Sequence, residues 1–160
     1  MLTMIAAHAN NNVIGAGNRL PWRCPADMSY FSKTSRSYRH VLMGTTTASG
    51  IGHLPDRVIH RFSRTPKRTS DSGELTFTTV EDVLSFNKHA PLLICGGQQI
   101  YTVFLPYASR LLLTQLDIDI DNGDAWFPHY TSIFDAKRII EQGVSNNIPY
   151  RVIEYVRKPL

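Results

Sequence analysis

The sequence lacks the features that mark several large classes of protein. Only two cysteines occur among its 160 residues, Cys24 and Cys95, and no C-x-x-C spacing is present. So few cysteines favour reduced thiols over a disulfide framework, and no metal site is predicted. The apolar runs are only a few residues long. A membrane-spanning helix needs about 18 consecutive apolar residues, so no membrane association is expected.

The N-terminus lacks the basic segment that precedes the apolar region of a secretory signal peptide. We therefore expect a cytoplasmic protein. Internal repeats, low-complexity tracts and long linkers rich in Ser, Pro or Gly are also missing. A chain of this length with 42% hydrophobic residues can bury a core without a metal or disulfide. The sequence thus predicts a single domain over residues 1–160.

The chain carries an excess of positive charge, with a formal net charge of +4. Much of this charge lies within residues 57–68, a stretch of twelve residues that contains no acid. Its basic side chains are Arg57, Arg61, Arg64, Lys67 and Arg68. Such a cluster suits either a solvated strand edge or an anionic ligand. Nucleic-acid surfaces pair basic side chains with exposed aromatic rings, and Phe62 is the only such ring here. No nucleic-acid partner is predicted.

Strand-like and helix-like segments alternate along most of the chain. Strands are predicted over 2–8, 40–43, 57–62, 92–95 and 110–117, and then near 136–142 and 150–157. Helices are predicted over 25–35, after Gly44 with threonine hydroxyls as its cap, from a capping box at 78–82 to about 87, and over 97–104. This order favours an α/β fold: a mostly parallel twisted sheet with antiparallel C-terminal strands and helices on both faces.

One acidic residue, Asp27, is predicted to lie in the first turn of a helix that opens at Pro25. An acid there is often only structural, because it faces the positive end of the helix dipole. Met28 and Phe31 follow closely, so the carboxyl group is expected to border apolar surface, where its protonated form is favoured. Trp22, just upstream, either packs or orients a water. The segment therefore predicts an acid suited to proton transfer.

Paired glycines, Gly96 and Gly97, follow a buried strand and precede a helix. The full dinucleotide fingerprint G-x-G-x-x-G is absent, so the pair alone is a weak signal. Gly44 with the threonines at 45–47 repeats the arrangement after another strand. Both turns are of the kind that brings backbone N–H groups up to phosphate at the carboxyl edge of a sheet.

These residues belong to a longer series of matches, in which the chain resembles bacterial dihydrofolate reductases from Met1 to nearly Leu160. The matching segments are Ile5-Ala6-Ala7, Val13-Ile14-Gly15, Leu20-Pro21-Trp22, Pro25-Ala26-Asp27, Phe31, Met43-Gly44, Ile51-Gly52, Leu54-Pro55, Arg57, Phe62-Ser63-Arg64, Gly96-Gly97, Ile100-Tyr101, Phe104-Leu105-Pro106, Leu113-Thr114, Gly123-Asp124 and Phe127-Pro128. The likeness rests on their order and spacing rather than on any single match.

The resemblance implies reduction of dihydrofolate to tetrahydrofolate, with hydride transfer to C6 of the pterin and protonation of N5. It implies catalytic roles for Asp27, its supporting hydroxyl Thr114, the water-holding Trp22, and Leu20 of a loop that closes over the site. Arg57 would pair with the substrate α-carboxylate. The remaining substrate-binding residues implied are Ile5, Ala6, Met28, Phe31, Ile51, Leu54, Cys95 and Tyr101. Antifolate inhibitors are expected ligands, and a monomer is the expected state.

The resemblance also implies NADPH as the cofactor, with Ser63 and Arg64 receiving its 2′-phosphate. The other cofactor-binding residues implied are Ala7, Ile14, Asn18, Leu20, Gly44, Thr45, Thr46, Thr47, Gly96, Gly97, Gln98, Gln99, Ile100 and Tyr101. The Gly96-Gly97 peptide is expected to be cis, and Gly123-Asp124 to steady the closed loop.

Five residues depart from the usual pattern of the family: Thr45, Thr46, Ala48, Cys95 and Gln98. Thr45 replaces an arginine of many relatives, so one expected phosphate contact is either weaker or supplied by another residue. Two other functions stay open at this level. One is the NADPH-dependent reductase of riboflavin biosynthesis, which shares the fold. The other is a noncatalytic protein that keeps the fold for assembly or for binding.

Overall fold

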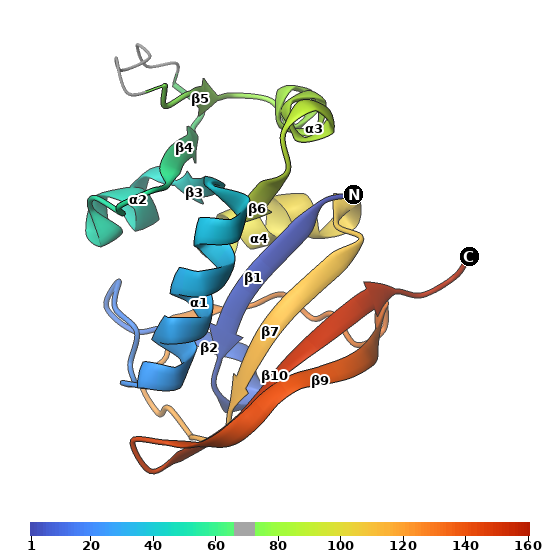
Figure 1. Ribbon diagram of the computed structural model, residues 1–160. Coiled ribbons are helices and arrows are strands. Elements are labelled where there is room, and N and C mark those ends of the chain that lie inside the picture. The colour runs from blue at the N-terminus through green and yellow to red at the C-terminus, as the bar shows by residue number, and fades with distance from the viewer. Residues whose placement is uncertain (66–72) are drawn as a thin grey trace.

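A computed structural model describes residues 1–65 and 73–160 of the chain. In these ranges an eight-stranded sheet has the order β5-β4-β3-β6-β1-β7-β10-β9, and β2 and β8 form a separate pair (Figure 1). The strands are β1 (Thr3–His8), β2 (Val13–Gly15), β3 (His40–Gly44), β4 (Val58–Phe62), β5 (Thr76–Phe77), β6 (Leu92–Ile94), β7 (Arg110–Leu116), β8 (Ala125–Trp126), β9 (Phe134–Ser145) and β10 (Ile148–Arg157). The α-helices are α1 (Pro25–Tyr38), α2 (Thr45–Ile51), α3 (Val80–His89) and α4 (Gln98–Phe104), and short 3-10 turns cover Asn10–Asn12 and Leu105–Tyr107.

The sheet is parallel except at its C-terminal end. Strand β1 is central and pairs in parallel with β6 on one side and β7 on the other. Strand β10 runs antiparallel to both β7 and β9. The predicted fold, a mostly parallel sheet that ends in antiparallel strands, is therefore confirmed. No helix among the described residues is long and apolar enough to cross a bilayer.

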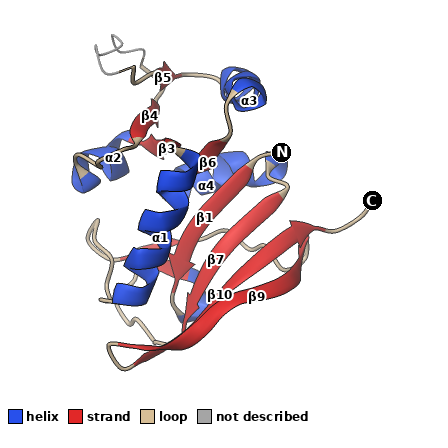
Figure 2. Cartoon of the chain, in the orientation of Figure 1, coloured by secondary structure: helices blue, strands red, loops and turns tan. Residues whose placement is uncertain are grey.

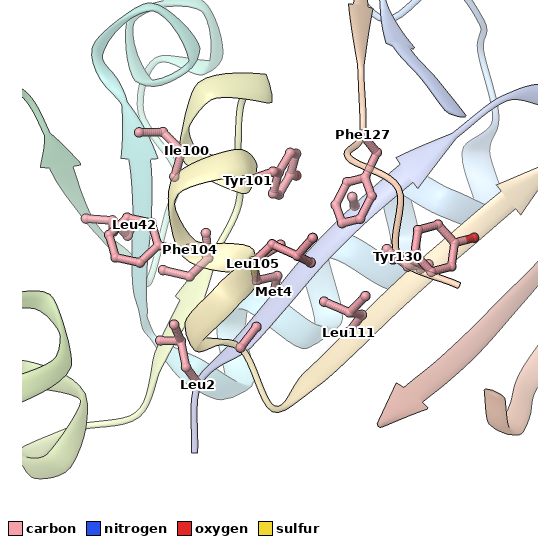
Figure 3. Close-up of a cluster of buried hydrophobic side chains, with 14 of the residues drawn as sticks. Leu2, Met4, Leu42, Ile100, Tyr101, Phe104, Leu105, Leu111, Phe127 and Tyr130 are labelled. Carbon is pink, nitrogen blue, oxygen red and sulfur yellow. The ribbon is translucent and has the colours of Figure 1, made fainter. Parts of the chain in front are cut away.

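Helices cover both faces of the sheet, as predicted (Figure 2). Alternation along β1 separates the two cores, because successive side chains of a strand point to opposite faces. Met4 and Ala6 join the cluster beneath α4, together with Tyr101 and Phe104 (Figure 3). Ile5 joins the cluster beneath α1. The acid-bearing helix and the helix after the paired glycines thus lie on opposite sides of β1.

Several local predictions need correction. The strands β2, β5 and β8 were not predicted, because two or three residues carry no readable alternation. Threonine capping of α2 is wrong: Gly44 is the N-cap residue and no side chain caps that helix. The capping prediction for α3 is confirmed, since the Thr79 hydroxyl accepts a hydrogen bond from the Asp82 backbone N–H at 3.2 Å. Helix α1 continues to Tyr38, beyond the predicted end near residue 35.

A buried carboxylate, Glu154 on β10, ties α1 to the antiparallel end of the sheet. It accepts hydrogen bonds from Arg138 Nε at 2.8 Å and from Arg110 Nη1 at 3.3 Å. Arg110 also donates to the Tyr38 hydroxyl at the end of α1. The hydrogen bond from Arg138 lowers the pKa of Glu154. Because buried carboxylates need such donors, this network stabilises the folded state.

We expect Glu154→Gln to lower the free energy of unfolding by about 2 kcal/mol at pH 7, through loss of charge-assisted hydrogen bonds. A lowered carboxyl pKa stabilises the fold above the unfolded value of 4.5, and this contribution is lost as the pH falls through the folded value. Urea unfolding at pH 7 and pH 4 measures both effects. The control is Asp135→Asn, which removes an exposed pair with Lys158 at 3.8 Å and should change little. Equal losses for both variants would contradict the role of burial.

Candidate active site

The predicted acid, Asp27, is buried at the start of α1. Pro25 occupies the first turn, and Asp27 itself is only 8% exposed. Burial raises the pKa of the Asp27 carboxyl group to about 6, and a hydrogen bond with the Thr114 side chain opposes part of this rise. Thr114 comes from the middle of β7, where it pairs with Ala7 of β1. Near neutral pH the carboxyl group therefore exists in both protonation states, as a proton-transfer residue requires.

Trp22, upstream of α1, presents a donor without an acceptor. Its Nε1 atom is buried, and the described residues provide it with no hydrogen-bond partner. Its ring packs against the small cluster of Cys24, Leu116 and Ile148. Buried N–H groups are almost always paired in folded proteins, so this donor points to a bound water or a ligand atom as its acceptor. The packing role and the water-orienting role of Trp22 are thus compatible.

The predicted substrate-contacting side chains fall into three groups. Ile5, Phe31, Leu54 and Cys95 share the cluster beneath α1. A second group stays open to solvent, with Met28 at 55% and Ile51 at 40% exposure, and Leu20 of the predicted closing loop is 50% exposed as well. These large apolar side chains are the kind that a flat aromatic ligand covers. In the third group, Ala6 and Tyr101 lie on the α4 side of the sheet.

Arg57 lies between α2 and β4, where two protein acceptors hold its guanidinium group. Nε donates to the Pro55 carbonyl at 2.9 Å, and Nη1 donates to the Ser35 hydroxyl at 2.9 Å. Ser35 did not stand out in the sequence. Its spacing of eight residues from Asp27, with Phe31 halfway, was the available signal, because residues at i, i+4 and i+8 share a helix face. No carboxylate among the described residues forms a salt bridge with Arg57.

The two glycine turns meet at the carboxyl ends of the neighbouring strands β3 and β6. The Gly44 N–H donates to the Gly96 carbonyl at 2.9 Å, so the turns are directly bonded. A Cβ atom on Gly44 would lie 3.1 Å from Ile100 Cγ1, and one on Gly97 would lie 3.1 Å from Thr47 Oγ1. Neither helix has a side-chain cap. Two uncapped helix starts side by side offer backbone N–H groups to an extended diphosphate. The expected cis peptide between Gly96 and Gly97 is confirmed.

Tyr101 and Gln98 of α4 connect this turn to other elements. The buried Tyr101 hydroxyl donates to the Ile5 carbonyl at 2.7 Å. The side-chain oxygen of Gln98 accepts from the Trp126 N–H at 2.8 Å, which joins α4 to β8. Gln98 therefore makes a specific contact at the position where it departs from the family pattern. Thr45, Thr46 and Gln99 are partly or fully exposed at the two helix starts.

The predicted 2′-phosphate residues follow β4. Ser63 accepts a hydrogen bond from the Thr65 backbone N–H at 3.3 Å, and Arg64 is exposed. Lys67 and Arg68 of the basic cluster lie outside the described residues. Arg61 points elsewhere, because its Nη1 donates to the Ser49 hydroxyl of α2 at 3.3 Å. The cluster therefore divides into side chains with separate surroundings.

The segment that carries Ile14, Asn18 and Leu20 is tied to the loop before β8. The Asp124 carboxylate accepts from the Gly17 N–H, and the Asp124 N–H donates to the Gly15 carbonyl, both at 3.0 Å. A Cβ atom on Gly123 would lie 2.6 Å from Val13 Cγ1, so only glycine fits there. Ile14 packs on the cluster beneath α4, and Asn18 adopts φ +60° in a tight turn. The predicted contact between Gly123-Asp124 and this segment is present.

A buried acid on one side of β1 and two bonded glycine turns at the carboxyl edge define an α/β enzyme built for a nucleotide cofactor. The chain belongs to the dihydrofolate reductase family, whose model matches residues 1–157. Its predicted family, fold and reductase activity are thereby confirmed.

Individual relatives agree with this assignment. The chain is 36% identical over 134 residues to dihydrofolate reductase type 3 of Salmonella typhimurium, covering 83% of this chain and 82% of that protein. It is 34% identical over 161 residues to dihydrofolate reductase of Neisseria meningitidis serogroup A, covering 98% of each. The structure of dihydrofolate reductase from Enterococcus faecalis in complex with NADP(H) and RAB-propyl superposes with a TM-score of 0.87 at 24% identity, over 99% of this chain and 97% of that one.

Proposed function

We propose that this chain reduces 7,8-dihydrofolate to tetrahydrofolate with NADPH, and that Asp27 promotes the protonation of pterin N5. The observation that carries the proposal is the buried position of Asp27, whose pKa is raised to about 6. The N5=C6 bond gains a hydride at carbon and a proton at nitrogen. NADPH supplies the hydride when bound. The protein must therefore help to deliver the proton, which is the task of an acid with this pKa.

Three side chains share the proton chemistry. Asp27 accepts a hydrogen bond from the pterin amino group and holds the ring in register. Thr114 supports the carboxyl group through its own hydrogen bond. Trp22 orients a water with its buried Nε1 donor, which the described residues leave without an acceptor. Proton transfer to N5 proceeds through that water.

The substrate tail extends from this end of α1 toward Arg57. Ile5, Phe31, Leu54 and Cys95 flank the rings from one cluster, and Met28 and Ile51 lose exposure when the ligand covers them. Ala6 and Tyr101 lie on the opposite face of β1 from this cluster. They act by holding the backbone of β1 in place, as the bond from the Tyr101 hydroxyl to the Ile5 carbonyl does, rather than by direct side-chain contact with the substrate. The guanidinium group of Arg57, which forms no salt bridge with any described carboxylate, binds the substrate α-carboxylate.

The cofactor residues form a continuous path along the carboxyl edge of the sheet. Ala7 and Ile14 hold the nicotinamide carboxamide, and Asn18 and Leu20 belong to the loop that closes over it. The two helix starts hold the diphosphate through residues 44–47 and 97–101, and Ser63 with Arg64 holds the 2′-phosphate. The glycine contacts and uncapped helix starts support this path. Closing the loop excludes water from hydride transfer.

The activity test is the loss of NADPH absorbance when purified protein is mixed with NADPH and dihydrofolate. We expect turnover that requires both NADPH and dihydrofolate. Absence of turnover across a range of pH would overturn the proposal. A dihydrofolate reductase of known activity, assayed in parallel, controls for substrate quality.

Arg64→Ala should raise the Kd for NADPH by roughly 10- to 100-fold, because one charge-assisted contact to the 2′-phosphate is lost. The Kd for NADH should change little. Fluorescence titration with both cofactors measures the difference. Arg61→Ala is the matched control, because it also removes one arginine charge, three residues earlier and within β4, from a side chain that contacts Ser49 instead. Equal losses for NADPH and NADH would place the 2′-phosphate elsewhere.

We further propose that the chain works as a monomer in the cytoplasm, without nucleic acid. The two free cysteines, Cys24 and Cys95, are compatible with a reducing compartment. Sedimentation velocity at micromolar concentration tests the monomer, and a concentration-dependent increase in mass would contradict it.

A further inference from the structure

Two histidines pair on the face of the sheet that carries the cluster beneath α4. His40 of β3 and His60 of β4 share this face with Leu42, which pairs with His60 in the sheet. Their rings stack with centroids 5.2 Å apart, and Phe86 of α3 packs edge-on against both. His60 is only 1% exposed. A buried imidazole needs partners for its nitrogens, and the proton chemistry of the site requires neither histidine.

The hydrogen bonds of the pair define which nitrogen carries each proton. The Leu75 backbone N–H donates to His60 Nδ1 at 3.0 Å, so this nitrogen is the acceptor. In a neutral His60 the proton therefore lies on Nε2, which donates to His40 Nδ1 at 3.0 Å. The proton of a neutral His40 then lies on its own Nε2. A further proton on the pair would break one of these two bonds, because both acceptor nitrogens are already used.

The surroundings keep the pair neutral. Burial, and secondly the neighbouring His40, lower the pKa of His60 to about 4. Burial, and secondly the charge of Arg39, lower the pKa of His40. Neither imidazole forms a salt bridge with a described carboxylate, and Phe77 of β5 and Phe86 of α3 face His60 with apolar rings. At neutral pH His60 therefore presents an acceptor to the Leu75 N–H.

The bond to Leu75 holds a short edge strand in place. Strand β5 has two residues and lies at the end of the sheet, next to β4 (Figure 1). The Arg61 N–H donates to the Leu75 carbonyl, and the Ser63 N–H donates to the Phe77 carbonyl, both at 2.9 Å. Together with the bond to His60, both polar backbone groups of Leu75 are thus held by β4. Because Ser63 is bonded to β5, a displacement of β5 would displace Ser63.

From this geometry we propose that His60, oriented by His40, is a positioning residue, which sets β5 and through it Ser63 and Arg64 for the 2′-phosphate of NADPH. The inference rests on the proposed role of Ser63 and Arg64 in cofactor binding. His60 acts through the backbone of β5 and not by contact with the phosphate. It contributes to the preference for NADPH over NADH, since only NADPH carries the 2′-phosphate.

Two substitutions of His60 separate its two bonds. His60→Asn places an amide oxygen near the position of Nδ1 and keeps an acceptor for Leu75, whereas His60→Gln places its amide near Nε2 and leaves Leu75 without one. We expect His60→Gln to raise the Kd for NADPH about fivefold, the size of one lost hydrogen bond, with the Kd for NADH unchanged. His60→Asn should leave both values within twofold of the unmodified protein. Fluorescence titration with each cofactor measures the four values.

A change at the donor side removes the same bond without altering the buried imidazole. Leu75→Pro lacks the N–H, so it should raise the Kd for NADPH about as much as His60→Gln does, and Leu75→Ala controls for the lost side chain. The double variant Leu75→Pro with His60→Gln should show no further rise. Hydrogen exchange of the Leu75 N–H adds a readout without cofactor: it should be at least about tenfold faster in His60→Gln, and unchanged in His60→Asn and in the exposed control His89→Gln.

The outcomes distinguish this inference from the proposal on which it rests. An equal rise in the Kd for NADPH and NADH in His60→Gln would overturn the inference, and so would equal effects of His60→Gln and His60→Asn. If Arg64→Ala weakened NADPH and NADH alike, the proposed 2′-phosphate site would be wrong, and the role of His60 in cofactor preference would be overturned with it. Selective weakening of NADPH in Arg64→Ala, His60→Gln and Leu75→Pro together would support both.

Discussion

Asp27→Asn should reduce kcat at pH 7 by at least about 100-fold, because an amide keeps the shape of the carboxyl group but cannot deliver a proton. The Kd for NADPH should stay within a factor of two or three, since the proposed diphosphate contacts lie at the carboxyl ends of β3 and β6 rather than at the start of α1. Pre-steady-state measurement of hydride transfer isolates the affected step, and fluorescence titration measures cofactor binding. Turnover within threefold of the unmodified protein would rule out the proton role of Asp27.

The pH dependence of the same pair of proteins gives a second test. With a pKa of about 6, Asp27 loses its proton as the pH rises from 5 to 7. The rate of hydride transfer in the unmodified protein should therefore fall above about pH 6, approaching tenfold per pH unit. The Asp27→Asn variant should show a low rate that does not vary over this range, because its amide does not titrate.

The substitution should also stabilise the protein. An acid whose pKa rises from 3.8 to about 6 on folding costs stability once it ionises, so the free energy of unfolding falls as the pH rises between these values. The full cost above pH 6 is about 3 kcal/mol, at 1.36 kcal/mol per pKa unit. Asp27→Asn removes it, so the variant should be more stable at pH 8 and no more stable at pH 4. Urea unfolding at both pH values measures this, and a loss of stability at pH 8 would contradict the burial argument.

Much of the fold could be predicted because long elements carry their own signals. Apolar runs gave the strands β1, β3 and β7, and Pro25 gave the start of α1. The short pair β2 and β8 could not be predicted, since it depends on the Asp124 contacts with Gly15 and Gly17, more than 100 residues away in sequence. Threonine capping of α2 failed for a similar reason, because Gly44 is fixed by its long-range bond to Gly96.

The candidate site shows the same division between local and long-range information. The position of Asp27 in the first turn of α1 is local, and the sequence predicted its burial correctly. The contact between Ser35 and Arg57 joins α1 to the connection before β4, and no pattern in either segment required it. The departures at Cys95 and Gln98 were visible in the sequence, whereas the bond from Trp126 that gives Gln98 a role was not.

Gly96→Ala should be the most damaging single-methyl substitution at the cofactor edge. Gly96 adopts φ +109°, which L-residues with a Cβ atom rarely tolerate. The added Cβ would lie 2.9 Å from the Tyr101 hydroxyl and 3.0 Å from its ring. That ring cannot move freely, because it is buried and its hydroxyl donates to the Ile5 carbonyl. We expect a loss of about 3–5 kcal/mol in the free energy of unfolding from backbone strain and overpacking together.

The same substitution should weaken NADPH binding, since a displaced Gly96 carbonyl no longer holds the Gly44 N–H and the two helix starts separate. Gly50→Ala in α2 is the matched control: a Cβ there meets nothing within 4 Å, and the residue has an ordinary helical conformation. It should gain about 0.5–1 kcal/mol by restricting the unfolded chain. Thermal unfolding and NADPH titration of both variants test the contrast. Both changes add one methyl group, at the turn before α4 in one case and inside α2 in the other. Similar outcomes would therefore mean that the contact between the two glycine turns does not organise the cofactor edge.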